Sequence, residues 1–434
     1  MLDEPGRTRT GCLPRIGLTM HSFSRRGFLT GLAAGAAATA FSRTAFAQDN
    51  GLGPMEMQEG YDSVARPLAA AKSASPTFSP YTTQATENAL HQYAQIAAQG
   101  GWQPVTGKGR LKLGESADDI VSLRQRLIVT GDLAPSLADS NVFDSYLDGA
   151  VRRFQSRHGI LASGVVGDTT RAAMAIGVDI RQKQLELNIV RLRAMGGDLG
   201  ARYIMMNIPA TELEAVDNGA VEQRHNTVIG KPDRQSPVMS TQVQNINFNP
   251  FWTVPLSIIK KDLIPKMQKE PTYLADHHIR IFNPAGQEVP AEQVNWNTDE
   301  ATKMRFTQDP GFGNSLGQVR INIANQYGVY MHDTPYKSVF GSEYRFDSSG
   351  CARVQDVREL CAWILQGTEY TRDRIDEVIR SGARTTATPV AKVPVFWTYV
   401  TAWATPEGLV QFRDDVYNKD GYASLAVVSS DAPG

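Results

Sequence analysis

Two side chains that could carry out nucleophilic catalysis lie near each other in the sequence. Cys351 follows the run Ser348, Ser349 and Gly350, and His332 precedes them at the end of the segment YGVYMH. A thiolate attacks carbonyl carbon, while an imidazole accepts the thiol proton as a general base and later returns it as a general acid. The pair therefore predicts acyl transfer through a covalent intermediate, with Cys351 as the nucleophile and His332 as the base.

The residues after the cysteine indicate how its thiol could be activated. Apolar residues recur there at helical spacing, namely Val354, Val357, Leu360, Cys361 and Ile364. This spacing places Cys351 just before a helix N-terminus, where the helix dipole lowers a thiol pKa, and Cys361 on the buried face of that helix. We expect an ionised Cys351, whose backbone N–H forms an oxyanion hole with that of Ser349 or Gly350.

Further residues are candidates for orienting the base or lining the substrate pocket. Asp333 is expected to fix the tautomer of the imidazole through its backbone carbonyl or its carboxylate. Tyr330 shares a strand face with His332 and should line the acyl pocket. Ser348 and Trp252, the latter in the segment FWTVP, are further pocket candidates.

Each of these assignments has a structural alternative. Arg353 could bind a substrate carboxylate or form a salt bridge across the helix, and Trp252 could be a core aromatic. The cysteine and histidine could be a buried free thiol beside a hydrogen-bonded core imidazole. The glycine before the cysteine, the expected helix start and the arginine after it favour the catalytic interpretation.

Composition excludes several other functions. The chain has 434 residues, and its 44 Lys and Arg balance 45 Asp and Glu, which argues against a nucleic-acid binder with a large basic surface. Three cysteines are too few for a disulfide scaffold, and the seven histidines show no zinc-ligand spacing. No metal and no organic cofactor is expected.

The first part of the chain has the layout of an export signal. Arg25 and Arg26 precede a Gly- and Ala-rich apolar run, which predicts a twin-arginine-type signal peptide over residues 1–47 with cleavage after Ala47. A membrane anchor is the alternative, but the run is shorter than the roughly 20 residues that span a bilayer. Cleavage would remove Cys12 and leave a soluble periplasmic protein without a membrane span.

The rest of the chain divides into segments of different periodicity, and the expected fold class is α+β and multidomain. An apolar segment near the end, VPVFWTYVTAW, reads as one buried strand. The predicted segments are a flexible lead-in with one scaffold helix (48–110), a three-helix module (111–178), an amphipathic connector helix (179–200), a mostly β catalytic domain (201–365) with an inserted lid (about 261–312), and a C-terminal scaffold segment (366–434).

Two stretches resemble known families. AVRRFQSRHGI, a Gly-rich turn and GDTTRAAM resemble a three-helix peptidoglycan-binding module, for which a structural bundle without a ligand is the alternative. His332, a spacer and then Ser348 to Arg353 resemble the L,D-transpeptidase signature of His followed by S/T-x-G-C-x-R/N. RYIMMNIPA, NPFWTVPLSI, MHDTP and FRDDVY agree with the large periplasmic branch of that family, which adds such a module and a capping insertion. The chain departs from many small members at Ser349, where they have a second histidine.

The second resemblance implies a substrate and a reaction. Cys351 would attack the carbonyl between a meso-diamino acid and the terminal D-alanine of a stem tetrapeptide, release D-alanine, and pass the acyl group to an amine in a 3–3 cross-link. The implied partners are peptidoglycan stem peptides and glycan, with an outer-membrane lipoprotein as a further candidate acceptor and carbapenems as inhibitors. No nucleic acid and no cofactor is implied.

Two alternatives to transfer remain. A Cys/His peptidoglycan carboxypeptidase would hydrolyse the acyl-enzyme, although common wall peptidases of that kind place Cys before His, the reverse of the order here. A non-catalytic wall-binding scaffold would keep the fold for tethering. Products made from a tetrapeptide donor separate the first alternative from transfer, and a Cys351→Ala variant that retains full function would indicate the second.

Overall fold

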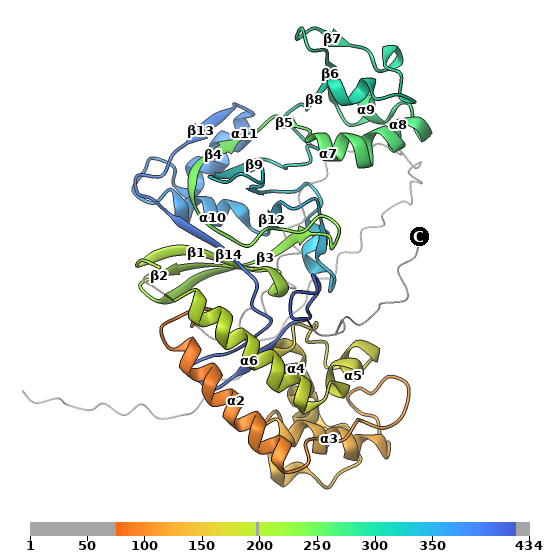
Figure 1. The fold of residues 1–434 in the computed structure, drawn as a ribbon, viewed down its shortest axis with the longest axis vertical. Helices are drawn as coiled ribbons and strands as arrows, with labels where there is room; N and C mark the ends of the chain where they lie inside the picture. Colours follow the sequence, from red (N-terminus) through yellow and green to blue (C-terminus); the bar gives the residue numbers. More distant parts are fainter. Residues whose placement is uncertain (1–74, 197–198, 422–434) are drawn as a thin grey trace, which may run out of the picture. The chain divides into compact units, whose positions relative to one another are not determined.

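The computed structural model describes residues 75–196 and 199–421. The predicted export signal, Cys12, most of the lead-in and the end of the C-terminal segment lie outside the described residues. Within these ranges, no helix is both long enough and apolar enough to cross a bilayer. A helical region precedes a large sheet in the chain, so the predicted α+β class is confirmed (Figure 1).

The helical region has two long helices that contact each other, α2 (Thr82–Ala98) and α6 (Val178–Ala194) (Figure 1). The chain between them forms α3 (Asp119–Val129), the 3-10 turn η1 (Pro135–Leu137), α4 (Ser145–Arg157) and α5 (Asp168–Ala175). These elements enclose a core of their own, which includes Ile120, Leu123, Leu127, Phe143, Leu147, Val151, Phe154 and Met174. Burial of such a core is what holds short helices together.

The connector helix α6 buries polar as well as apolar side chains. Leu185, Ile189 and Leu192 are buried as the spacing predicts, but Gln184 and Asn188 are buried with them. The Gln184 amide donates hydrogen bonds to two backbone carbonyls of the C-terminal segment, at 3.1 and 2.9 Å. The predicted apolar face is therefore incomplete, because this face also satisfies the backbone of an irregular neighbouring segment.

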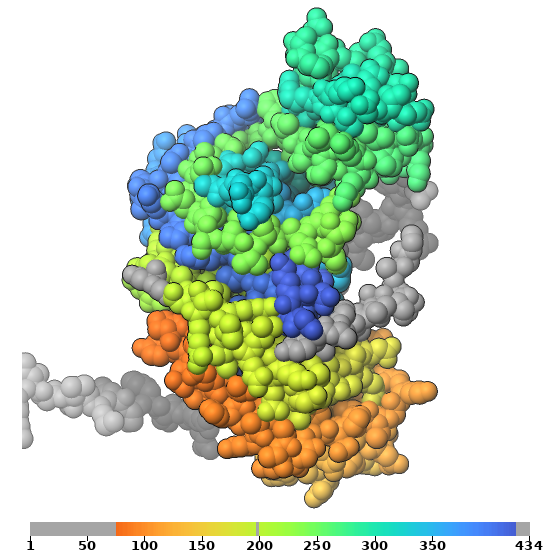
Figure 2. All heavy atoms as spheres, viewed as in Figure 1, coloured from red at the N-terminus to blue at the C-terminus, as the bar shows by residue number. Residues whose placement is uncertain are grey.

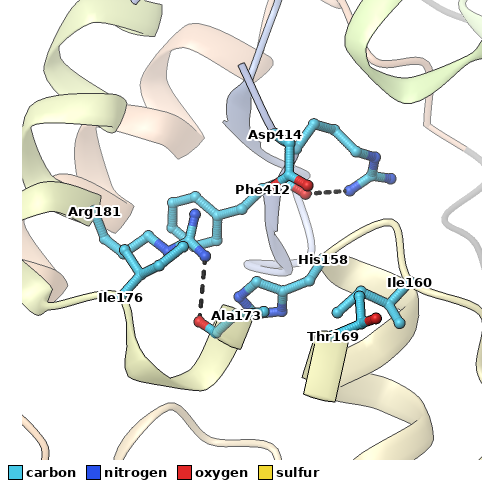
Figure 3. Close-up of a pocket in the computed structure, with 9 residues that line it drawn as sticks. His158, Ile160, Thr169, Ala173, Ile176, Arg181, Phe412 and Asp414 are labelled. Carbon is cyan, nitrogen blue, oxygen red and sulfur yellow. Dashed lines mark hydrogen bonds between the residues drawn. The ribbon is translucent and has the colours of Figure 1, made fainter. Parts of the chain in front are cut away.

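The three-helix region is attached to the end of the chain at the C-terminus of α4. The His158 ring stacks on Phe154 and on Phe412, with ring centroids 3.8 and 5.5 Å apart. His158, Phe412 and Arg181 converge around a small cavity of about 20 Å³ (Figure 3). Nearby, Arg191 of α6 binds Asp420 at 2.6 Å, and the last described residues lie on the surface of α6 in Figure 2.

The main sheet has ten strands, in the order β11-β3-β12-β10-β9-β4-β14-β1-β2, with β13 paired to β4. An additional pairing between β2 and β3 brings the ladder back to an earlier strand, so the sheet closes on itself. The strands are β1 (Arg202–Asn207), β2 (Glu212–Asp217), β3 (Ala220–Gly230), β4 (Met239–Phe248), β9 (Val319–Ile323), β10 (Met331–His332), β11 (Phe346–Ser348), β12 (Ala352–Val354), β13 (Thr385–Ala387) and β14 (Pro394–Thr398).

Two helices pack on this sheet, α10 (Val357–Ile364) and α11 (Arg372–Ser381), and their apolar residues join the core of the sheet. Cys361 is fully buried in that core, as predicted. Short turns complete the domain, namely η2 (Ile208–Ala210) and η6 (Lys337–Gly341).

Between β4 and β9 the chain forms a separate four-stranded sheet, in the order β5-β8-β6-β7 (Figure 1). This insertion has a hydrophobic cluster of its own and runs from β5 to β8, somewhat earlier than the predicted lid. Its elements are β5 (Trp252–Thr253), α7 (Leu256–Ile258), the π-helical turn η3 (Ile259–Leu263), α8 (Ile264–Lys269), α9 (Tyr273–Asp276), β6 (Ile279–Phe282), β7 (Glu288–Val289), η4 (Ala291–Gln293), η5 (Glu300–Lys303) and β8 (Arg305–Gln308).

The apolar C-terminal segment is two strands, so its prediction as one strand is wrong. β14 belongs to the main sheet, whereas β15 (Ala402–Ala404) pairs with β16 (Val410–Phe412) in a second, two-stranded sheet. Side chains from elsewhere hold the backbone between them, because Asn207 accepts from the Val400 N–H and Asn188 from the Thr401 N–H. The segment is buried as expected, but apolarity alone could not locate this break.

Candidate active site

Strand pairing brings the predicted nucleophile and base to the same face of the main sheet. β10 runs parallel to β12, with Met331 opposite Ala352 and His332 opposite Arg353. Because side chains alternate along a strand, Met331 and Ala352 point into the core, while His332 and Arg353 point to the other face. Cys351 directly precedes β12, which places it next to Tyr330 and diagonal to His332 on that face.

The helix predicted to follow Cys351 immediately is absent. Residues 352–354 form β12, and α10 begins only at Val357, after Asp356 with a left-handed φ of 47°. The apolar spacing correctly predicts a helix from Val357. It wrongly includes Val354, because a buried strand residue is apolar too. The dipole of α10 therefore does not act on the Cys351 thiol, since the effect is confined to the first turn.

Burial keeps both groups of the pair neutral. Cys351 is partly exposed and packs against the core of the sheet and the cluster of the insertion, and burial raises the pKa of its thiol to about 11. Burial and, next, the charge of Arg353 lower the pKa of His332 to about 3. The expectation of an ionised resting thiol is wrong, because desolvation outweighs the hydrogen bonds from Tyr330 and the positive charges that favour the thiolate.

The tautomer of His332 is set by the carbonyl of the next residue. His332 Nδ1 lies 2.6 Å from the backbone oxygen of Asp333, and a carbonyl can only accept, so Nδ1 carries the proton. Nε2 is then left with a lone pair, as a general base requires. The Asp333 carboxylate instead accepts from the Gln318 N–H at 3.0 Å and from Lys337.

Tyr330 and Trp252 form a chain of contacts that ends at the sulfur. Interactions with Tyr330 oppose the effect of burial on the Cys351 thiol pKa, and Trp252 in turn acts on the pKa of Tyr330. Both aromatic residues belong to the hydrophobic cluster of the insertion. The Tyr330 ring also meets the His332 ring edge-on, with centroids 5.6 Å apart.

The residues before the cysteine fix its backbone. Ser348 Oγ donates to the Cys351 carbonyl at 2.6 Å and accepts from the Gly350 N–H at 3.1 Å. Gly350 has a φ of +109°, a conformation that favours glycine. Because the Gly350 N–H is already bonded, the N–H groups of Cys351 and Ser349, for which no acceptor is recorded in the described part of the chain, are the better oxyanion-hole candidates.

Two family models match parts of this chain. The family model described as "L,D-transpeptidase catalytic domain" matches residues 201–391, and the one described as "Putative peptidoglycan binding domain" matches residues 116–174. Residues 201–391 are therefore similar to the L,D-transpeptidase catalytic domain. The match to the catalytic-domain model continues beyond residue 365, where the sequence patterns ended the catalytic domain. It includes β13, which belongs to the main sheet.

One curated relative, from Haemophilus influenzae, is named "Putative L,D-transpeptidase". It is 32% identical over 254 residues, which are 58% of this chain and 51% of the relative, so the match spans about half the length of that protein.

Solved structures with similarity include L,D-transpeptidases from Mycobacterium smegmatis and Xylanimonas cellulosilytica. The first is 14% identical with a TM-score of 0.23, covering 46% of this chain and 58% of that chain. The second is 14% identical with a TM-score of 0.22, covering 68% of this chain and 100% of that chain.

The site also contains residues that the sequence patterns did not indicate. Arg234, in the turn after β3, donates to both carboxylate oxygens of Asp262 in the insertion, at 2.6 and 3.0 Å, and to Ser349 Oγ at 2.9 Å. Ser236, in the same turn, donates to the Gly350 carbonyl at 2.9 Å. Nothing in the segment GKPDRQSP marks it as part of a site, because its position depends on the pairing of β3 with β11 and β12.

Arg353 lies in a strand, so the predicted alternative of a salt bridge across a helix is wrong. The sequence patterns did not indicate Arg320 either. It lies on β9, the neighbour of β10 on the side away from β12, and is directly opposite His332 in that pairing. The alternation of VRINIAN could have indicated it, since Arg320 falls on the polar face of that strand.

His277 and His278 lie in the insertion, and among the described residues no cluster of His, Cys, Asp and Glu could hold a metal ion.

Proposed function

We propose that this chain is an L,D-transpeptidase that cross-links peptidoglycan through an acyl-enzyme on Cys351. The observation that supports the proposal is the parallel pairing of β10, which ends at His332, with β12, which follows Cys351, inside the residues that match the family model. The match to a peptidoglycan-binding module supports peptidoglycan as the substrate. The proposed location is the periplasm, reached through the twin-arginine-type signal.

The neutral resting pair determines the order of proton transfers. As Cys351 Sγ attacks the carbonyl between the diamino acid and the terminal D-alanine, His332 Nε2 takes the thiol proton. The imidazolium then gives this proton to the amide nitrogen as the C–N bond breaks, so D-alanine leaves and a thioester remains. No thiolate needs to be present beforehand, which fits a thiol whose pKa is about 11.

The second half-reaction reverses these roles. An amine of an acceptor stem attacks the thioester carbonyl, and His332 takes the proton that the amine loses. The C–S bond breaks, the sulfur regains the proton, and a 3–3 cross-link is released. The Cys351 N–H would stabilise the oxyanion in both halves, and one such donor is typically worth about 2.7 to 4 kcal/mol of barrier.

Product analysis tests this function. The mature chain, from residue 48, is incubated with a disaccharide tetrapeptide that contains a meso-diamino acid. The proposal expects 3–3 linked dimers and free D-alanine. Tripeptide alone would mean hydrolysis, and unchanged tetrapeptide would contradict both activities.

Two cysteine variants provide the matched control. Cys351→Ala should abolish product, whereas Cys361→Ala, which changes a buried thiol of α10, should retain it. Substitution of His332 by Ala should slow acylation by about a hundredfold to ten-thousandfold. An outer-membrane lipoprotein tested as the acceptor would show whether attachment accompanies cross-linking.

A further inference from the structure

Two arginines flank the catalytic histidine on adjacent strands. Arg320 of β9 pairs directly with His332 from one side, and Arg353 of β12 pairs with it from the other. Residues directly opposite one another in a sheet project to the same face. Both guanidinium groups therefore lie on the face that carries His332 and Cys351, and both contribute to the electrostatics of that pair.

Neither arginine has a carboxylate partner among the described residues. The Arg320 guanidinium lies over the Tyr330 ring, 4.2 Å from its centroid, and its Nε is buried without a hydrogen-bond acceptor. The acidic residue that acts on the pKa of Arg353 is Asp347, which pairs with Lys231 at 3.0 Å. By contrast, Arg234 on the neighbouring turn has a bidentate carboxylate partner in Asp262.

An unpaired, half-buried cation is unfavourable. Both side chains are only partly exposed, and burial lowers the pKa of Arg353. Both charges also depress the pKa of the general base. The Tyr330 ring offsets part of this cost for Arg320, and an anionic ligand would compensate both charges and offer acceptors to their N–H groups.

We propose that Arg320 and Arg353 form a carboxylate-binding site that holds the donor stem peptide beside Cys351. This inference rests on the proposed function and adds Arg320 as a substrate-binding residue. A tetrapeptide donor offers two carboxylates near the scissile amide, that of the terminal D-alanine and that of the diamino-acid side chain. Guanidinium groups recognise either one by charge-assisted hydrogen bonds.

Donors that differ in one carboxylate test the site. The kcat and KM of the wild-type chain are measured with the free donor, with a donor amidated at the terminal D-alanine, and with a donor amidated at the diamino acid. We expect one amidation to lower kcat/KM by about tenfold to a hundredfold, the range for one charge-assisted hydrogen bond. The amidation that has this effect identifies the carboxylate that is bound.

Variants of Arg320 complete the test. Arg320→Gln should reduce kcat/KM for the free donor by the same factor, and should have little effect on the donor that lacks the recognised carboxylate. Arg320→Lys keeps the charge and should retain part of the activity. Arg380→Gln, at the exposed end of α11, is the matched control and should behave as wild type.

The outcomes separate the site from the function. Equal kcat/KM of the wild-type chain for all three donors would overturn the carboxylate site, whether or not the variants fold. An equal loss for Arg320→Gln on all three donors would also overturn it, because the residue would then only position His332 or the strand. A wild-type chain that consumes no donor would instead overturn the proposed function, and the inference with it.

Discussion

At the scale of single residues, the site depends on the environment of one sulfur atom. Cys351 lies between the core of the sheet and the cluster of the insertion, and this apolar contact on two sides raises its thiol pKa to about 11. His332 is lowered to a pKa of about 3 by burial. The pair is therefore a neutral thiol and a neutral imidazole, which exchange a proton only as the reaction proceeds.

The neutral pair predicts an unusual pH profile. Between its two pKa values of about 3 and about 11, neither group changes protonation, so the acylation rate constant should be level from about pH 5 to about pH 9. The measurement is the rate of carbapenem acylation followed by mass spectrometry. A rate that rises with pH along the titration of an ordinary thiol, with a pKa of about 8.5, would show that the resting thiolate is the reactive form.

At the scale of elements, an ion pair between Arg234 and Asp262 links the turn after β3 to the insertion. Arg234 connects Asp262 of η3 with Ser349, two positions before Cys351 in the chain, while Trp252 of the insertion shares a hydrophobic cluster with Tyr330. The insertion therefore contributes to positioning the segment that contains Cys351. Its ion pair is partly exposed, with 45% of the Asp262 side chain accessible, so it contributes little to global stability.

Breaking this pair should loosen the site without unfolding the protein. Asp262→Asn should lower kcat/KM by up to about fivefold and accelerate amide hydrogen exchange in η3 and in residues 346–351. Glu270→Gln is the control, since it removes a surface ion pair with Lys266 inside the same insertion. Unchanged exchange in residues 346–351 would show that the two segments are not coupled.

Sequence patterns predicted the composition of the site better than its geometry. The candidates Cys351, His332 and Asp333 could be chosen from short motifs, because a cysteine after glycine and a histidine before an aspartate already suggest a chemical role. Arg234 and Arg320 were missed because their proximity to Cys351 comes from strand pairing between distant segments. The sequence pattern predicted a helix where β12 lies, since a short buried run of apolar residues has no period that separates a strand from a helix.

At the scale of the whole molecule, the fold buries several neutral histidines. Burial lowers the pKa of His225 to about 4 and that of His332 to about 3, and it lowers the pKa of His158 well below its usual value. In the unfolded chain these groups titrate near a pKa of about 6.5. Between these values the unfolded chain binds more protons than the folded one, so stability is complete above about pH 6.5 and decreases as the pH falls toward 3.

This linkage predicts a specific loss of stability in acid. The free energy of unfolding in urea should fall from about pH 7.5 to about pH 5, and the fall should be smaller for His225→Gln than for the wild type, because one titrating group is removed. His91→Gln, at an exposed position of α2, should leave the slope unchanged. A wild-type stability that is constant over this range would contradict the burial of neutral imidazoles.

The central claim, that Cys351 is the nucleophile, is tested most directly by intact-mass spectrometry after exposure to a carbapenem. We expect one covalent adduct, located on the peptide that contains Cys351, and no adduct on Cys361, whose thiol is fully buried and whose pKa is raised by burial. Cys351→Ala should take up no label, and Cys361→Ala should be labelled as the wild type is. Labelling that persists in Cys351→Ala, or a wild-type chain that stays unmodified, would contradict the account.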